Sequence, residues 1–140
     1  MTKPMGPEEM RTWLMPIFRA EAREQAAAIA SGIDVLDGEA GRPGAPLSAA
    51  GREALDSAFR ACHSLASSAA TVGLAELHDI GRAAEEALGR VRDGGLALDA
   101  PLLGALHEAA EALGRLAEGG AAPAAAAAIV GRLRRAAGLE

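Results

Sequence analysis

Alanine and leucine supply much of the apolar content of this chain, and this restricts the fold more than any other feature of the sequence. Both residues favour helix, β-branched residues are sparse, and no window shows the apolar–polar alternation of a half-buried strand. Hydrophobic residues make up 50% of the 140 residues, which is enough for one domain with a real core. The sequence therefore predicts a single all-α domain over residues 1–140.

Glycine and proline divide the chain into five segments in which apolar residues recur at helical spacing. Short connections favour antiparallel neighbours, so we expect an antiparallel four-helix bundle with a fifth C-terminal helix. The first helix is expected to begin near Pro7, with a kink or late start at Pro16, and a loop over 37–47 follows it. The second helix should run from the N-cap Ser48 to about Ala70, and the third from after Gly73 to about Arg92. The fourth should run from the cap Asp99 to 118–120 and the fifth from about Pro123 to Ala137, before a tail over 138–140.

Charge and targeting features exclude several classes of protein. The net charge is −5 with both signs interspersed, and aromatic residues are too few to stack bases, so no nucleic acid partner is expected. The N-terminus has no basic region followed by an apolar core, and the longest apolar run, 121–130, is too short to span a bilayer. The single cysteine, Cys62, cannot form an internal disulfide. We expect a cytoplasmic protein without membrane insertion.

His63 lies at the middle of the second predicted helix and is followed mostly by small residues. At about 100° per residue it falls roughly 100° from the centre of the apolar stripe of that helix, at the edge of the buried face. Such a position is held by the bundle yet open to solvent. Spacing alone leaves open an ordinary surface histidine. The stripe consists of Leu55, Ala58, Phe59, Cys62, Leu65, Ala66 and Ala69.

The remaining candidate groups do not form a familiar site. His78 and His107 lie on separate predicted helices, without the spacing of a metal site. Cys62 and His63 are adjacent on one helix and point about 100° apart, so they do not make a nucleophile–base pair. Cys62 is most simply a small core residue. We expect no metal and no cofactor in the domain.

The stretch "AFRACHSLASSAATVGLAELHDIGRAAEEALGRVRDG" resembles the histidine-containing phosphotransfer (HPt) domain, in particular the CheA-type N-terminal phosphotransfer domain of chemotaxis kinases. The family pattern is roughly A-H-S-[LI]-K-G-[GS]-A-x-x-[FV]-G-[FL], and residues 62–74 read CHSLASSAATVGL. The segments "IFRAEAREQ" and "LALDAPLLGALHEAAEALGRL" resemble the first and fourth family helices. The resemblance implies that His63 is the phosphoacceptor, and that Arg60, Ser64, Ser67 and Ala70 form a surface for a docking receiver.

Two positions depart from the family pattern. Ala66 replaces a lysine that helps to steady the phosphoryl group, and Ser67 replaces a glycine that leaves room for the partner. On the third helix, Arg82 and Glu85 match a family histidine and glutamate that face the phosphoacceptor. The resemblance implies that Glu85 orients the ring of His63 and that Arg82 supplies the counter-charge that Ala66 cannot. The alternative for both is an exposed helix face.

The implied function is one step of a two-component, chemotaxis-like phosphorelay. A histidine kinase phosphorylates His63, and the phosphoryl group passes to an aspartate of a response-regulator receiver domain. ATP and magnesium would belong to these partners, because the chain carries no nucleotide motif of its own. The domain would be a phosphocarrier, either separate or part of a CheA-like histidine kinase. The rival reading is a degenerate bundle that binds a receiver or kinase as a scaffold or inhibitor without phosphate, which the missing lysine favours.

Overall fold

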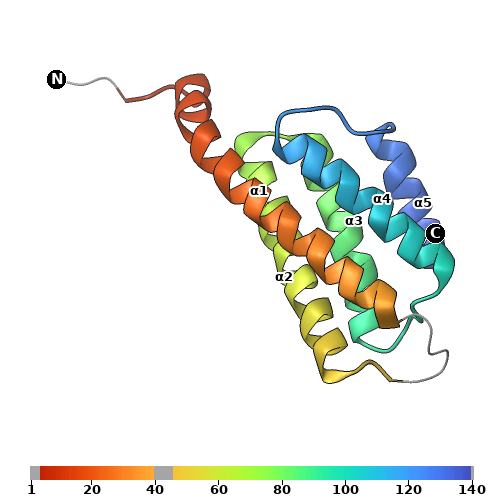
Figure 1. The fold of residues 1–140 in the computed structure, drawn as a ribbon. Helices are drawn as coiled ribbons and strands as arrows, with labels where there is room; N and C mark the ends of the chain where they lie inside the picture. The colour runs from red at the N-terminus through yellow and green to blue at the C-terminus, as the bar shows by residue number, and fades with distance from the viewer. Residues whose placement is uncertain (1–3, 40–45, 140) are drawn as a thin grey trace.

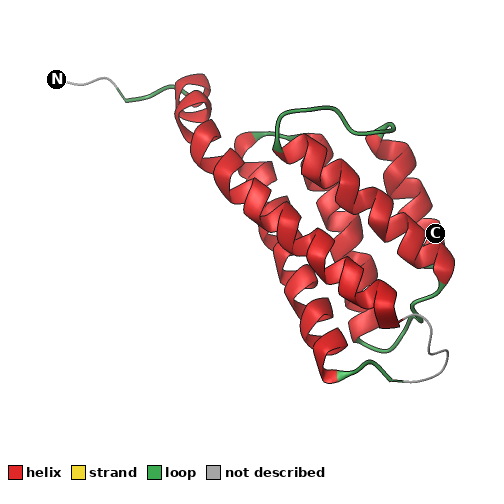
Figure 2. Ribbon diagram, viewed as in Figure 1, coloured by secondary structure: helices red, strands yellow, loops and turns green. Residues whose placement is uncertain are grey.

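The computed structural model describes residues 4–39 and 46–139, and every regular element in that part of the chain is an α-helix (Figure 2). The all-α class is therefore confirmed for the described residues, which contain no strand. The helices, in chain order, are α1 (Pro7–Glu39), α2 (Ala49–Val72), α3 (Ala75–Arg92), α4 (Ala100–Ala117) and α5 (Ala126–Ala136).

The first four helices pack in a ring. α1 contacts α2, α2 contacts α3, α3 contacts α4, and α4 returns to α1, while α5 lies against α3 and α4. The chain runs up one helix and down the next (Figure 1). Leucine and isoleucine fill the centre of the ring, and alanines between them let the helices approach closely. The largest fully buried side chains are Ile29, Ile33, Leu36, Leu65, Leu77, Ile80, Leu88, Leu102, Leu106, Leu113, Ile129 and Leu133.

Both ends of α2 are fixed by caps. The Ser48 hydroxyl accepts a hydrogen bond from the amide of Gly51, which confirms Ser48 as the N-cap. At the other end Gly73 adopts a left-handed conformation with φ +77°, and the amide of Leu74 donates to the carbonyl of Ala69. The helix continues to Val72, two residues past the expected end, because that side chain is buried. Glycine is needed at position 73 to make this turn.

Helix α1 begins at Pro7, as expected. It runs through Pro16, so the late start, one of the two alternatives expected there, is wrong. It also continues into the predicted loop 37–47, as far as Glu39. The buried side chain of Leu36 holds this last part, and the Glu39 carboxylate accepts a hydrogen bond from the amide of Ser48. Residues 40–45 of the predicted loop lie outside the described residues.

The C-terminal expectations also need correction. α5 begins at Ala126 rather than near Pro123, because the alanines before it have no larger apolar side chain to bury. Residues 138 and 139 of the expected tail are ordered against α5 and the core. Gly138 takes a left-handed conformation with φ +69°, the amide of Leu139 donates to the carbonyl of Arg134, and the Leu139 side chain packs against the core. Residue 140 lies outside the described part.

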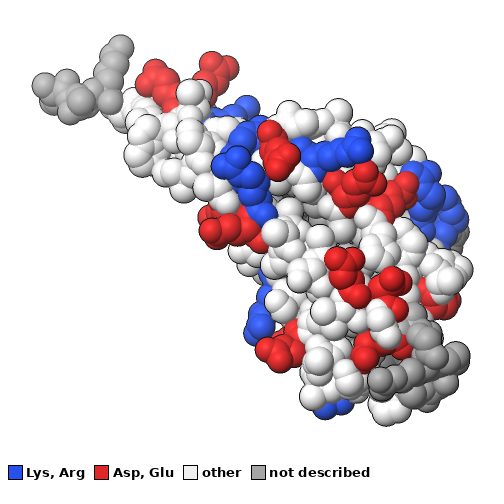
Figure 3. Space-filling model, in the orientation of Figure 1, with Lys and Arg blue, Asp and Glu red and all other residues white. Residues whose placement is uncertain are grey.

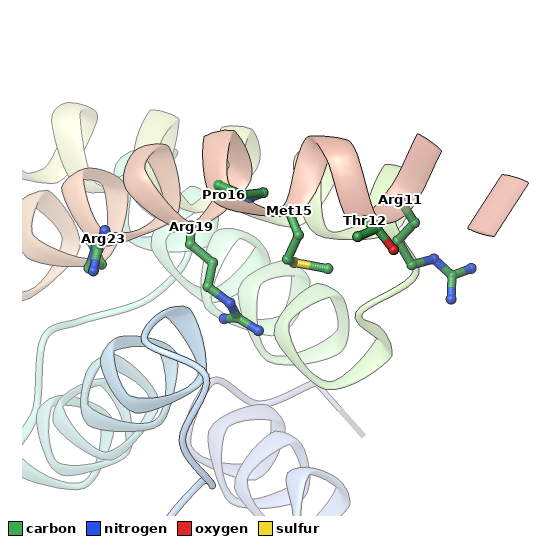
Figure 4. A pocket seen from close by; sticks show the side chains of 6 residues that line it. All are labelled: Arg11, Thr12, Met15, Pro16, Arg19 and Arg23. Atoms are coloured by element: carbon green, nitrogen blue, oxygen red, sulfur yellow. The ribbon is translucent and has the colours of Figure 1, made fainter. Parts of the chain in front are cut away.

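The N-terminal turns of α1 project beyond the ends of the other helices (Figure 1). One arginine, Arg19, ties α1 to the bundle near this projection. The Arg19 guanidinium donates to the carbonyls of Leu116 and Ala117 at the end of α4, at 3.2 and 3.1 Å. Arg19 and Met15 point from α1 toward the neighbouring helices and line a groove of about 580 Å³ (Figure 4). Helix C-termini carry partial negative charge, so the arginine suits this position.

A close contact between α1 and α2 predicts a large effect for one glycine, Gly32. A Cβ on Gly32 would lie 2.9 Å from the Ala54 carbonyl oxygen and from Ala58 Cβ, so Gly32→Ala must push the helices apart. We expect the free energy of unfolding in urea to fall by about 1–3 kcal/mol. The matched control is Gly38→Ala on the same helix, where a Cβ meets nothing within 4 Å, and a gain of up to about 1 kcal/mol is expected. Equal effects of the two substitutions would contradict the packing described.

Candidate functional site

His63 lies on α2, past its midpoint, and projects from the bundle. Its side chain is 60% exposed, whereas its neighbours Cys62 and Leu65 are buried. The position at the edge of the buried face is therefore confirmed. Because α2 is capped at both ends, the ring is mounted on a rigid element and still reaches solvent.

Glu85 of α3 holds one side of the His63 ring. The distance from His63 Nδ1 to Glu85 Oε2 is 2.7 Å, and the Glu85 side chain is only 16% exposed. An ionised carboxylate only accepts hydrogen bonds, so Nδ1 is the donor, and the neutral ring keeps its lone pair on Nε2. The family resemblance implied this contact, and the distance confirms it. The pair presents a nucleophilic nitrogen that points away from the carboxylate.

The second oxygen of Glu85 has no such partner. Oε1 is buried and accepts no hydrogen bond, and the Nε of Arg82 lies 3.9 Å away. This is an ion-pair distance, beyond hydrogen-bond range. The Arg82 side chain is 64% exposed. The arginine therefore lies beside the carboxylate on the solvent side, where its largely exposed side chain can meet another anion.

The position of the family lysine faces the neighbouring helix. Ala66 is 1% exposed, and a Cβ built on Gly81 of α3 would lie 3.2 Å from Ala66 Cβ. The helices approach so closely here that a long side chain at position 66 would require them to separate. Alanine at this position follows from helix packing, and the nearest cation that α3 offers to the site is Arg82.

The other predicted surface residues lie on α2 around His63. Arg60, Ser67 and Ala70 are exposed, and Ser64 is half-buried. Arg60 pairs with Asp56 at 3.4 Å, one turn away on the same helix. Apart from Arg60, the side chains beside the histidine are small, so the surface is shallow.

Two features near the site were not predicted. The first is a contact of His78, on α3, whose Nδ1 lies 3.0 Å from the carbonyl oxygen of Ala66. The sequence signal that places His78 on this side of α3 is its helical spacing of four and seven residues from Arg82 and Glu85. The Arg92 guanidinium also stacks over Phe59, 4.0 Å from the ring centre. This stack lines a hollow of about 420 Å³ beside Glu85. No sequence pattern pointed to the stack.

His107 lies away from the other two histidines. Its ring nitrogens are 4.0 Å from Asp34 and 3.8 Å from Asp37, both on α1. Across residues 4–39 and 46–139, no three histidine, cysteine or acidic residues gather as a metal site would require. In the same ranges, no helix has both the length and the hydrophobicity for a bilayer crossing.

Cys62 is a core residue, as expected. Burial, and secondarily the negative charge of Glu85, raise the pKa of its thiol to about 12. A thiol with this pKa remains protonated at neutral pH and is a poor nucleophile. Its role is to fill space behind the His63–Glu85 pair.

The raised pKa of Cys62 predicts a loss of stability at high pH. The folded state holds the proton more tightly than the unfolded chain, whose thiol has a pKa of 9.0, so its contribution is complete below pH 9 and declines toward pH 12. The sequence contains no tyrosine and one lysine, Lys3, so few other groups titrate in this window. Unfolding free energies measured from pH 8 to 11 should fall for the wild type and much less for Cys62→Ala. Parallel curves would contradict the burial of the thiol.

Comparison with known proteins agrees with this geometry. The family model for the Hpt domain matches residues 14–116, which include α2, α3, His63 and Glu85. A search of curated proteins found no significant match. The family match covers well over half of the chain and includes the histidine–glutamate pair. The chain belongs to the Hpt domain family.

Proposed function

We propose that His63 is the phosphoacceptor of this Hpt domain, receiving a phosphoryl group from a histidine kinase and passing it to a response-regulator aspartate. Family membership makes the chain a histidine phosphotransfer module of phosphorelay signalling. The observation that carries the assignment to His63 is its 2.7 Å hydrogen bond from Nδ1 to Glu85, which leaves Nε2 free at the surface. His78 is half-buried, with one ring nitrogen beside a backbone carbonyl, and His107 lies near two aspartates.

The chemistry needs little from the domain beyond this pair. In the first transfer, a bond forms between Nε2 and phosphorus as the bond from phosphorus to the ADP oxygen breaks. The ring becomes positively charged, and Glu85 stabilises that charge through the Nδ1 proton. In the second transfer, an aspartate oxygen displaces Nε2 from phosphorus. ATP and magnesium belong to the kinase and the receiver in this proposal, which assigns no cofactor to the domain.

The remaining residues have supporting roles in the proposal. Arg82 is the counter-charge for the phosphoryl group, because its guanidinium is exposed beside Glu85 and position 66 carries no cation. Arg60, Ser64, Ser67 and Ala70 form a shallow docking surface suited to a partner that must leave after transfer. The finer reading of the fold is an antiparallel four-helix bundle with α5 added. We also place the domain in the cytoplasm, in a CheA-like system.

A second candidate function is a scaffold or inhibitor that binds a receiver or kinase without carrying phosphate. The observation that favours it is the burial of Ala66 against Gly81, which leaves α2 without the family lysine. The two functions share a docking surface and differ in whether Nε2 of His63 reacts.

Phosphorylation of His63 alone is the expected result of a direct labelling test. Phosphoramidate, a small phosphoryl donor, and a panel of CheA-type kinases with ATP serve as alternative sources. The product should be lost in acid and survive base, as expected of an N-phosphate, and His63→Gln should abolish it. His78→Gln and His107→Gln are the matched controls and should be labelled like the wild type. An unlabelled wild type that still binds a receiver would establish the scaffold function, and label retained in His63→Gln would exclude His63 as the acceptor.

Glu85→Ala should slow phosphorylation of His63 by about 10- to 100-fold. A hydrogen bond to a charged partner is worth roughly 1.5–3 kcal/mol, and this one is strengthened as the ring gains charge. The measurement is the rate of phosphoramidate labelling, with circular dichroism to verify the fold. Glu86→Ala is the control, because that neighbouring carboxylate pairs with Arg134 of α5 and not with the ring. Equal rates for Glu85→Ala and the wild type would remove Glu85 from the mechanism.

A further inference from the structure

A stacked pair of side chains, Phe59 and Arg92, lies beside the candidate site. Phe59 precedes His63 by four residues on α2, so the two lie within about 40° of each other around the helix axis and about 6 Å apart along it. The Arg92 guanidinium lies 4.0 Å from the centre of the Phe59 ring. Phe59 is the only phenylalanine, tyrosine or tryptophan in the sequences of α2 and α3. The stack therefore gives the shallow surface around His63 one large feature.

The backbone of α3 holds the ring in this place. A Cβ built on Gly89, one turn after Glu85, would lie 3.2 Å from Phe59 Cε2, so glycine gives the ring its room. This contact lies one turn from the His63–Glu85 contact along both helices. Arg92 covers the ring, while its own side chain stays 42% exposed. Because the ring is seated and the guanidinium is stacked on it, little side-chain freedom remains to be lost when a partner binds.

A hollow of about 420 Å³ joins the stack to the candidate site. Phe59 and Arg92 line it, and so does Glu85, whose carboxylate holds the His63 ring. Arg82 lines it as well, with a side chain that is 64% exposed. A partner group that enters the hollow therefore meets both the stack and the surroundings of the histidine.

A partner that reaches Nε2 of His63 must also cover the stack. A stable complex buries roughly 800 Å² on each side, and a circular patch of that area has a radius of about 16 Å. A transient complex with about half that area still has a radius of about 11 Å. Phe59, about 6 Å from His63 along α2, lies well inside either patch. The stack is thus near the centre of the interface, where the residues that dominate binding are found.

The charge of the stack indicates the chemistry of the partner surface. The ring covers one face of the Arg92 guanidinium, so the N–H groups in its plane stay available. Within residues 4–39 and 46–139, Arg92 has an ion pair only with the adjacent Asp93, at 3.5 Å from Nε to Oδ1. A carboxylate next to an apolar side chain would be complementary to this guanidinium and ring.

We propose that Phe59 and Arg92 form a specificity-determining anchor for the receiver domain, which places an apolar side chain against the ring and a carboxylate against the guanidinium. The inference rests on the proposed function for the identity of the partner. The receiver is favoured over the kinase because the stack adjoins the surface of α2 already assigned to receiver docking, and extends that surface onto the C-terminal end of α3.

Binding of a receiver domain to the unphosphorylated full chain tests the anchor. The probe is the receiver that binds the wild type most tightly in a panel of purified receiver domains, and its dissociation constant is measured by calorimetry. Arg92→Ala and Phe59→Leu should each raise this constant about 5- to 30-fold, as expected for central interface residues. Arg92 is exposed, so its loss leaves the core intact.

The matched control is Arg115→Ala, because Arg115 lies on α4 and pairs with Glu111 of the same helix. Helices α1 and α4 form another face of the molecule, on which charged side chains of both signs are interspersed (Figure 3). This substitution should change the dissociation constant by less than about 2-fold. Arg92→Lys keeps the charge but loses the planar stack, so it should weaken binding as Arg92→Ala does.

Transfer kinetics separate docking from chemistry. When His63 is loaded with phosphoramidate, Arg92→Ala should raise the KM for the receiver by the same factor as the dissociation constant, with a smaller change in kcat. Equal receiver binding by the wild type, Arg92→Ala and Phe59→Leu would overturn the proposal. A loss confined to phosphorylation by a kinase would overturn the choice of partner. A wild type that cannot be phosphorylated would count against the proposed function alone, since the binding measurement needs no phosphoryl group.

Discussion

The close approach of α2 and α3 at Ala66 and Gly81 is the constraint on which the candidate site depends. A Cβ on Gly81 would lie only 3.2 Å from that of Ala66, so the helix backbones are as close as small residues allow. The two helices run in opposite directions (Figure 1). One turn back on α2 and one turn further on α3 therefore lead to His63 and Glu85, which meet at 2.7 Å. Packing of small residues thus sets the distance at which the histidine–glutamate hydrogen bond forms.

This packing also accounts for the electrostatic character of the site. The close contact leaves no room for a lysine on α2, and it buries most of Glu85, including an oxygen that accepts no hydrogen bond. A carboxylate in that setting gains from any nearby positive charge. Arg82 lies at 3.9 Å. In the proposed reaction, phosphorylation at Nε2 would make the His63 ring a second cation. The substitution of the family lysine and the presence of Arg82 are thus parts of one arrangement.

The sequence pattern was sufficient for the helices and their main caps, because each has a local or periodic signal, whereas the histidine–glutamate contact was implied by the family resemblance. Ser48, Gly73 and Asp99 mark helix ends through their own side-chain or backbone chemistry, and all three act as expected. The C-terminal end of α1 and the packing of Leu139 could not be predicted, since the burial of Leu36 and of Leu139 depends on contacts distant in sequence. The stack of Arg92 on Phe59 was missed for the same reason.

The tautomer of His63 tests the central claim most directly, because the nucleophile proposed is the nitrogen that Glu85 leaves free. A long-range ¹H–¹⁵N NMR spectrum of the neutral rings distinguishes a protonated nitrogen from one with a lone pair. The account predicts that His63 carries its proton on Nδ1 and its lone pair on Nε2, and that Glu85→Ala removes this preference. A wild-type His63 protonated on Nε2, or a preference unchanged in Glu85→Ala, would contradict it.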